Sequence, residues 1–317
     1  MTTTVPLFLD LQVNGHGGVD LLTAQTVDDI RKVSRSLLAQ GVGAYLPTLI
    51  TGPLDRTLAV MKLIELARRS PLEEEAEIIG IHLEGPFLSS EKPGVHPIDY
   101  LSLPTEDLLG KYLTAGTVAM VTLAPEIPGA LTAIKFLEKM GVVVSLGHSN
   151  ANAAQAHAGF DAGAKAVTHI WNAMSKDPTP GVGLAGAALE REEIAIQLIV
   201  DGVHLTDDQV LYTIAAAPDR FIVTNDAVSP AGLGEGTFPF GTFEVTVRDG
   251  RALRSDGVLA GGVGSLKDSL ARLLSLGISF DSALASITSR PAALIGRSDL
   301  GILGLGRTTT VLQVSRG

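Results

Sequence analysis

The 317-residue chain contains no cysteine. Disulfide bonds and thiolate metal ligands are therefore excluded, and only histidine, carboxylate and water remain as metal ligands. Basic residues are also few, since 24 Lys and Arg oppose 34 Asp and Glu for a formal net charge of −10. The sequence has no basic stretch of the kind that binds along the phosphate backbone of a nucleic acid, so we expect no nucleic-acid partner.

Long apolar runs are missing as well. No positive charge precedes Arg31 and no apolar run of eighteen residues follows it. The sequence therefore predicts neither a signal peptide nor a membrane span, and we expect a soluble cytoplasmic protein. Aromatic residues make up only 4%, against 45% hydrophobic residues and 35 glycines. This composition indicates a tightly turned interior packed with Ala, Val and Leu.

Apolar runs rich in Val, Ile and Leu alternate with amphipathic helical patterns along most of the chain, which is typical of repeated βα units and a parallel sheet. The predicted strands are Pro6–Val13, Gly43–Ile50, Glu77–Leu83, Thr117–Leu123, Val142–Leu146, Ala164–Thr168, Ala195–Val200 and Arg220–Thr224. The predicted helices between them are Val27–Ala39, Leu54–Arg69, Thr105–Ala115, Ala130–Met140, Ala151–Ala162 and Thr206–Ala216. Eight such units predict an α/β fold, the (β/α)8 TIM-like barrel.

The pattern changes after the eighth run. The runs Phe238–Val247 and Arg251–Leu259 flank Asp249 and Gly250, which predicts a β-hairpin insertion over residues 238–259. Helices Ser265–Ser275 and Ser279–Ser289 then complete a barrel domain of residues 1–300. Residues 301–317 are expected to form a short C-terminal strand segment.

Four ionisable residues each close a predicted strand, where active sites of this fold lie. Glu84 follows the third run, His148 the fifth, His169 the sixth and Asp226 the eighth. His148 and His169 are about one βα repeat apart, so they would lie on adjacent strands and face the same end of the barrel. One acid and two imidazoles suit a Zn²⁺ ion that keeps an open position for water.

Other polar residues lie at the same rim, namely Asp10, Gln12 and Asn14 with the first run and His204 with the seventh. Asp226 would move protons as the general base, and His204 would polarise the scissile carbonyl of an amide. Structural roles compete with these: Glu84 as a buried salt-bridged acid, Asp226 as a helix N-cap or hairpin anchor, and Asp201 as a turn acid.

Seven motifs along nearly the whole chain resemble the N-acetylglucosamine-6-phosphate deacetylase family of the amidohydrolase superfamily. They are DLQVNGHGGVD at 10, HLEGPFLS at 82, GHSNA at 147, THIWNAMS at 168, DGVHL at 201, NDAVSPAG at 225 and LAGG at 259. The resemblance implies a homodimer that hydrolyses the acetamide of a small amino sugar. It also implies the metal ligands Glu84, His148 and His169, the acid and base Asp226, and the carbonyl partner His204.

By the same resemblance, the backbone of Asn172 and Ala173 would hold the sugar phosphate. Val95 and the segment Leu259, Ala260 and Gly261 would contact the sugar. Superfamily members with two metals often carry His-x-His after the first strand, where this chain has Gln12 and Asn14. We therefore expect one divalent metal, Zn²⁺ first, with Fe²⁺, Ni²⁺ or Co²⁺ as alternatives.

The chain departs from the family pattern at its periphery. The loop from Ser175 to Gly181 lacks the Arg that binds phosphate in relatives, although Lys176 offers a point charge there. The N-terminal strands of the family's accessory β-sandwich are missing, so that sandwich is expected to be reduced or absent. The main prediction is deacetylation of N-acetylglucosamine 6-phosphate to glucosamine 6-phosphate and acetate. An unphosphorylated or different N-acyl amino sugar is the alternative, and a non-catalytic sugar-binding barrel is the third.

Overall fold

Parallel strands form the centre of the molecule, in a computed structural model that describes residues 4–175 and 183–302. Their hydrogen-bonded order is β1–β4–β6–β7–β8–β9–β10–β11, which follows the chain order around the sheet. Their bounds are β1 (Phe8–Val13), β4 (Val42–Ile50), β6 (Ile81–Glu84), β7 (Val118–Leu123), β8 (Val143–Leu146), β9 (Ala166–Val167), β10 (Ala195–Leu198) and β11 (Phe221–Val223), and β5 (Glu77–Ile78) extends the sheet beside β4.

The sheet closes almost completely between β11 and β1. Ser286 O accepts the backbone N–H of Val223 at 3.0 Å, and Ile287 O accepts that of Leu9 at 2.9 Å. The Thr224 hydroxyl donates to the Asp10 carboxylate across the same gap at 2.7 Å. The predicted α/β barrel is confirmed as a mostly parallel, nearly closed arrangement of eight strands.

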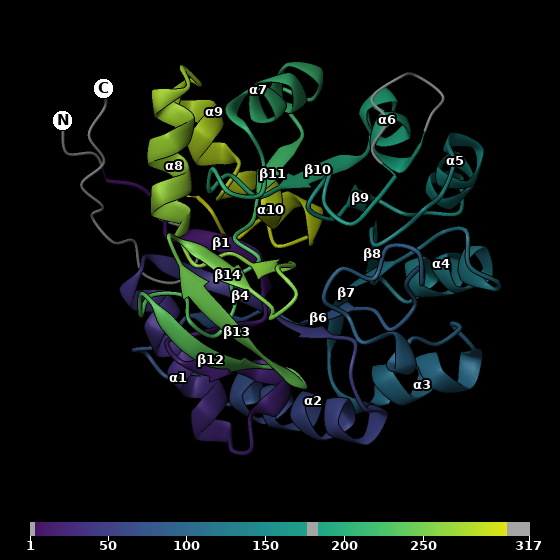
Figure 1. Ribbon diagram of the computed structural model, residues 1–317, viewed down its shortest axis with the longest axis horizontal. Helices are drawn as coiled ribbons and strands as arrows, with labels where there is room; N and C mark the ends of the chain where they lie inside the picture. The colour runs from purple at the N-terminus through teal and green to yellow at the C-terminus, as the bar shows by residue number, and fades with distance from the viewer. Residues whose placement is uncertain (1–3, 176–182, 303–317) are drawn as a thin grey trace.

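Helices surround the strands in chain order (Figure 1). They are α1 (Val27–Ala39), α2 (Leu54–Arg69), α3 (Glu106–Ala115), α4 (Ala130–Lys139), α5 (Ala153–Asp161), α6 (Gly183–Glu190), α7 (Asp207–Ala216), α8 (Leu266–Ser275), α9 (Phe280–Ala285) and α10 (Ser289–Leu294), with the short 3-10 turns η1 (Leu21–Thr23) and η2 (Ile98–Tyr100). Because the helices cover its outer face, all nine residues of β4 are buried.

Local sequence explains where several helices begin. Thr26, Asn152, Thr206 and Ser265 each cap a helix and exchange hydrogen bonds with the residue three positions later. Such reciprocal bonds satisfy two backbone donors that a helix start leaves free. Each capping residue therefore sets where the preceding loop ends and where the helix of the outer layer begins.

An antiparallel sheet lies over one side of the strand ends (Figure 1). It pairs β12 (Gly236–Phe240), β13 (Phe243–Arg248), β14 (Arg251–Leu253) and β15 (Leu259–Gly261) in that order. A two-stranded ribbon, β2 (Gly15–His16) with β3 (Val19–Asp20), precedes η1. A separate hydrophobic cluster that includes Phe240 and Val245 packs this sheet against Ile50 at the end of β4.

Several predicted boundaries differ from the structure. The predicted strand Glu77–Leu83 is two strands separated at Gly80 (φ 151°). The run Phe238–Val247 contains a turn between β12 and β13, and the predicted helix Ser279–Ser289 ends early, because α9 stops at Ala285 and α10 begins only at Ser289. Helix α6 was not predicted, and residues 303–317 of the predicted C-terminal strand segment lie outside the described residues. Among the described residues, no helix has both the length and the hydropathy that a bilayer span requires.

Candidate metal and catalytic site

Unusual backbone conformations mark the strand ends that carry the predicted site. Glu84 is the last residue of β6, and His148 and His169 each lie two residues beyond the end of β8 and β9. His148 (φ 48°), His169 (φ 29°) and Asp226 (φ 50°) all adopt the left-handed region, which is uncommon outside glycine. Such conformations persist where the surroundings enforce them, often at functional sites.

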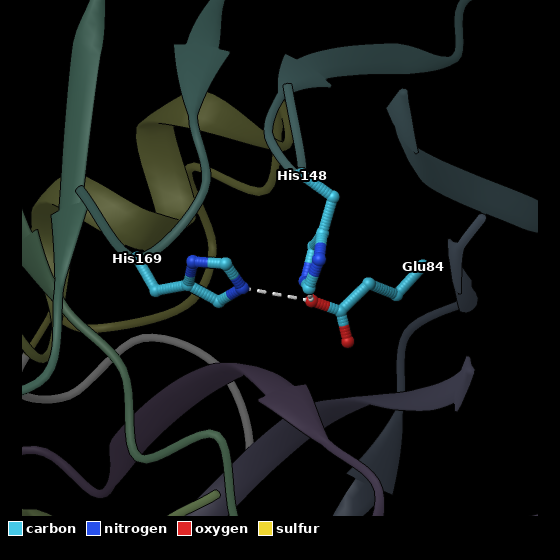
Figure 2. Close-up of side chains that lie close together, drawn as sticks. All are labelled: Glu84, His148 and His169. Atoms are coloured by element: carbon cyan, nitrogen blue, oxygen red, sulfur yellow. Dashed lines mark hydrogen bonds and ion pairs between the residues drawn. The ribbon is translucent and has the colours of Figure 1, made fainter. Parts of the chain in front are cut away.

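The three predicted metal ligands converge on one point, as Figure 2 shows. Glu84 Oε1 lies 2.9 Å from His169 Nε2 and 3.2 Å from His148 Nε2. One ligand atom from each residue falls within 4.8 Å of the others, and all three residues are buried. Two atoms bound at about 2.1 Å to one tetrahedral ion would lie about 3.4 Å apart, so the observed spacing fits a single Zn²⁺-sized cation.

The orientation of His148 also suits a metal ligand. Its Nδ1 donates to the backbone carbonyl of Lys92 at 3.0 Å. A carbonyl only accepts, so Nδ1 carries a hydrogen, and Nε2 is the nitrogen that would lose its hydrogen to bind a cation at the point shared with Glu84. This backbone partner fixes ring orientation and tautomer in the manner of the outer partners of metal-bound histidines.

Buried charges within the cluster are matched. Burial alone would raise the pKa of Glu84, but hydrogen bonds from His148 and His169 outweigh it and hold the pKa well below its usual range. Burial acts to lower the pKa of His169, and the Glu84 carboxylate outweighs that effect and raises it. The amide of Gln12 donates to the same Oε1 at 2.9 Å. Glu84 is thus an ionised carboxylate with donors around one oxygen.

Asp226 lies in the same pocket as the cluster, but its surroundings shift its pKa in the opposite direction from that of Glu84. Burial and the nearby Glu84 charge raise its pKa to about 6. The amide of Asn14 donates to Asp226 Oδ1 at 2.7 Å. Asp226 is 8% exposed, so it retains access to the pocket. A carboxyl group with a pKa nearer neutrality is suited to exchange protons.

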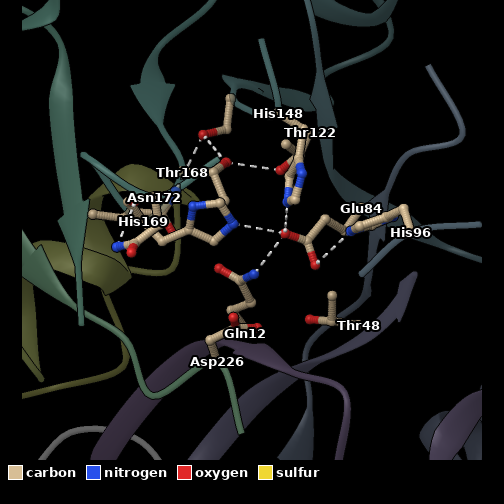
Figure 3. Close-up of polar contacts among 12 residues, drawn as sticks. Gln12, Thr48, Glu84, His96, Thr122, His148, Thr168, His169, Asn172 and Asp226 are labelled. Carbon is tan, nitrogen blue, oxygen red and sulfur yellow. Dashed lines mark hydrogen bonds and ion pairs between the residues drawn. The ribbon is translucent and has the colours of Figure 1, made fainter. Parts of the chain in front are cut away.

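His96 was missed by the sequence analysis. Its ring lies 4.4 Å from that of His148, and its Nε2 is 3.9 Å from Glu84 Oε2 (Figure 3). Burial and the neighbouring His148 lower the pKa of His96 to about 3, so the ring is neutral. The backbone N–H of Thr51 points to Nδ1 at 3.3 Å, which places the ring proton on Nε2 beside Glu84. His96 lies between Val95 and Pro97, in a loop without periodicity. The only signal for it in the sequence is that histidine is a rare residue type.

A layer of hydroxyl groups supports the cluster from within the barrel (Figure 3). His82 Nε2 contacts the Thr122 hydroxyl at 2.7 Å, Thr122 contacts Thr168 at 2.8 Å, and Thr168 donates to Ser145 at 2.6 Å. His82, Thr122 and Ser145 lie in β6, β7 and β8, Thr168 directly follows β9, and all four are fully buried. The network satisfies polar groups that would otherwise be costly in the interior, and it fixes the strand ends beneath the site.

A pocket of about 350 Å³ opens over the cluster. Its lining contains Asp226 and the three predicted metal ligands. It also contains every predicted substrate contact, namely Val95, Asn172, Ala173, His204, Leu259, Ala260 and Gly261. The structure therefore brings together residues from seven separate motifs, and β15 supplies one wall of the pocket.

Close backbone packing places β15 next to Asp226. Gly262 N donates to Asp226 O at 2.8 Å. A Cβ on Gly262 would lie 2.2 Å from Asn225 O, and one on Gly261 (φ 150°) would lie 2.5 Å from Asp226 O. Only glycine fits at such distances, so the paired glycines of the LAGG motif allow the antiparallel sheet to reach the loop that carries Asp226.

One cationic side chain lines the pocket. Lys92 is the sole Lys or Arg among the described lining residues, which include the acids Glu84, Glu91 and Asp226. Its ammonium forms no ion pair within residues 4–175 and 183–302. The loop that carries Lys92 and Gly94 lies close to the loop after β9, since a Cβ on Gly94 would be 3.7 Å from Ala173 Cβ. The family comparison in the sequence analysis pointed to residues 175–181 for a phosphate contact, and residues 176–182 lie outside the described part.

The fold and cluster define an α/β barrel with a candidate divalent-metal centre at the carboxyl ends of its strands. The chain belongs to the amidohydrolase family, since the model described as "Amidohydrolase family" matches residues 5–308. The resemblance inferred from the motifs is thereby confirmed.

Individual relatives agree with this assignment. The chain is 32% identical to an N-acetylglucosamine-6-phosphate deacetylase of Caenorhabditis elegans, over 98% of this chain and 78% of the relative. It is 31% identical to an N-acetylgalactosamine-6-phosphate deacetylase of Escherichia coli O157:H7, over 98% of this chain and 83% of the relative. A similar solved structure is N-acetylglucosamine-6-phosphate deacetylase from Pasteurella multocida, with a TM-score of 0.90 and 31% identity, covering 96% of this chain and 80% of that one.

Proposed function

We propose that this protein is a metal-dependent deacetylase that converts N-acetylglucosamine 6-phosphate and water to glucosamine 6-phosphate and acetate. One observation carries the proposal: Glu84, His148 and His169 meet at a single point in a pocket that also contains Asp226. Relatives named as deacetylases of two different amino-sugar 6-phosphates support the substrate class.

Glu84, His148 and His169 would hold one divalent cation, and Zn²⁺ fits this donor set best. A bound cation of this kind lowers the pKa of a coordinated water and polarises a carbonyl oxygen. Gln12 and Asn14 direct their amide nitrogens to Glu84 and Asp226, which supports one metal ion rather than two.

Asp226 would accept a proton from the attacking water and then deliver it to the departing amine nitrogen. Its raised pKa matches both steps, because the same group must be a base first and an acid second. His204 would donate a hydrogen bond from Nε2 to the acetamide oxygen, where negative charge develops. Carbon–nitrogen cleavage then needs no covalent link to the protein.

Sugar recognition would come from the two sides of the pocket. Val95 and the β15 residues Leu259, Ala260 and Gly261 would contact the ring. Asn172 and Ala173 would offer backbone N–H groups to the phosphate, and Ala173 N–H donates to no described residue. Lys92 would supply the positive charge, which a chain with a net charge of −10 must provide locally for an anionic substrate.

An assay of acetate and amine release, with the purified protein at known metal content, tests the proposal. We expect turnover of N-acetylglucosamine 6-phosphate, lower turnover of the galactosamine epimer and little of N-acetylglucosamine. Equal turnover with and without the phosphate would instead favour an unphosphorylated N-acyl amino sugar. No turnover of any N-acetyl sugar by the metal-loaded protein would contradict the deacetylase.

Two further expectations are retained as proposals. The family resemblance implies a homodimer, and the sequence implies a cytoplasmic location. Light scattering coupled to gel filtration tests the first, and a mass of one 33.0 kDa chain would contradict it.

A further inference from the structure

Asp201 makes contact with His204 through both of its carboxylate oxygens. Oδ1 accepts the backbone N–H groups of Val203 and His204 at 2.8 and 2.9 Å. Oδ2 accepts a hydrogen bond from His204 Nδ1 at 2.7 Å. Both side chains are largely buried, with 13% and 6% exposed. The carboxylate therefore holds the backbone turn with one oxygen and the imidazole with the other.

This contact determines which nitrogen of the His204 ring faces the pocket. A carboxylate only accepts, so His204 Nδ1 carries a hydrogen. Within the described residues Nε2 has no hydrogen-bond partner, and His204 lines the pocket. Burial alone would raise the pKa of Asp201, but the contacts with the His204 ring and with the backbone N–H groups of His204 and Val203 together lower it. An ionised acid at this place also balances positive charge on the ring.

We propose that Asp201 is a positioning residue for hydrolysis, because it holds the His204 ring with Nε2 toward the substrate carbonyl and stabilises the ring when it is protonated. The proposal rests on the deacetylase function proposed above, since it needs His204 to act on the scissile carbonyl. It assigns Asp201 more than the role of a turn acid, which the backbone bonds to Oδ1 alone would give.

Asp201→Asn separates the two roles. The side-chain oxygen of Asn can still accept the N–H groups of Val203 and His204, so the turn is retained. Its amide nitrogen then faces Nδ1 and donates, so Nδ1 loses its hydrogen and the compensating negative charge is removed. The ring can then offer Nε2–H only as a neutral imidazole, which is a weaker donor to developing negative charge than the protonated ring that Asp201 stabilises. We expect kcat for the phosphorylated sugar to fall about 10- to 1,000-fold, with KM changed less than threefold.

A double-mutant cycle with His204→Gln shows whether Asp201 acts through the histidine. We expect Asp201→Asn to cost less than threefold in kcat when His204 is already replaced. Equal losses in both backgrounds would overturn the proposal, because they would show a role in the loop alone. Asp161→Asn, an exposed acid at the end of α5 paired with Arg191, is the matched control and should leave kcat unchanged.

Nitrogen NMR of ¹⁵N-histidine-labelled protein gives a readout that does not depend on turnover. In the unmodified protein we expect His204 Nδ1 to be protonated at every pH at which the chain is folded. Asp201→Asn should move the proton of the neutral ring to Nε2. A neutral His204 with its proton on Nε2 in the unmodified protein would overturn the proposal. An absence of deacetylation with the expected tautomer would instead contradict the proposed function alone.

Discussion

Two buried carboxyl groups share the pocket, and their surroundings move their pKa values in opposite directions. Hydrogen bonds from two imidazoles hold the pKa of Glu84 well below its usual range despite its burial. Among the described residues, the Asp226 carboxyl group accepts a side-chain hydrogen bond only from Asn14, and burial and the Glu84 charge raise its pKa to about 6. Separate pKa values for paired acids divide their roles, so Glu84 is suited to bind a cation and Asp226 to transfer protons.

Asp226→Asn tests this division. Asn has nearly the same shape but exchanges no proton, so we expect kcat to fall by about 10²- to 10⁴-fold. Metal content should stay at one ion per chain, because Asp226 is outside the predicted ligand set. Activity assays and elemental analysis of the same preparation measure both. Near-normal kcat would remove Asp226 from its role, and loss of the metal would make it a ligand.

Lys92→Met tests the charge that we assign to phosphate binding. Methionine keeps an unbranched side chain and removes the ammonium. We expect KM for N-acetylglucosamine 6-phosphate to rise about 3- to 5-fold, which corresponds to about 0.7–1 kcal/mol for a partly exposed ion pair. Activity toward N-acetylglucosamine should not change. Lys111→Met on the exposed face of α3 is the control. An equal effect on both sugars would contradict a phosphate contact.

The residues that the sequence singled out for the candidate site lie together in the pocket, but some of their neighbours were not predicted. Glu84, His148, His169 and Asp226 were recognisable because each closes an apolar run, and parallel strands bring such positions together. His96 lies in an aperiodic loop, and only the fold places its ring beside His148. The pocket position of Lys92 depends likewise on the path of that loop, which no local pattern specifies.

At the scale of elements, the β12–β15 sheet is joined to the barrel through buried polar contacts as well as apolar ones. Asp20, at the end of β3, accepts the N–H groups of Thr23 and Gly241 on one carboxylate oxygen at 3.1 and 3.0 Å. Gly241 lies in the turn between β12 and β13. The same sheet forms one wall of the pocket. The contact between Asp20 and Gly241 therefore helps to hold that wall in place in the folded protein.

The pH dependence of the stability of Asp20→Asn tests how much the Asp20 contact contributes to folding. Burial raises the Asp20 pKa from 3.8 to about 6, so the folded state binds the proton more tightly than the unfolded chain. The resulting stabilisation is present below about pH 4 and is lost as pH rises through about 6. Asn keeps the accepting oxygen without the charge. Relative to the unmodified protein, its free energy of unfolding should therefore increase by up to about 3 kcal/mol between pH 4 and 7.

Urea unfolding at a series of pH values measures this difference. Metal content must be the same in both proteins, so that metal linkage cancels. A difference between the two free energies that does not vary from pH 4 to 7 would show that Asp20 titrates alike in the folded and unfolded states.

Elements were predictable where periodicity is strong and less so where composition is bland. The alternation of apolar runs and amphipathic helices predicted all eight barrel strands. Helix α6 has the sequence GLAGAALE and buries six of its eight residues, so it shows no polar face from which to detect it. The break at Gly80 lies within an apolar run, and its positive φ becomes visible only in the fold.

At the scale of the whole molecule, the metal cluster joins strands that are distant in sequence. Glu84 closes β6, and the two histidines follow β8 and β9, so one bound cation would connect the ends of three barrel strands. The unfolded chain cannot preserve this geometry across 85 residues. Binding of the cation should therefore stabilise the folded state by mass action.

Metal removal and return measure this coupling. After treatment with a chelator, we expect a lower Tm, and return of Zn²⁺ at 100 times its Kd should restore about 2.7 kcal/mol. Glu84→Gln keeps the side-chain shape but loses the negative charge, so the Zn²⁺-dependent rise in Tm should disappear. Asp161→Asn should keep that rise. An equal rise in Glu84→Gln would place the stabilising ion elsewhere, because a cation held by the two imidazoles alone would bind far more weakly than one that also has the carboxylate.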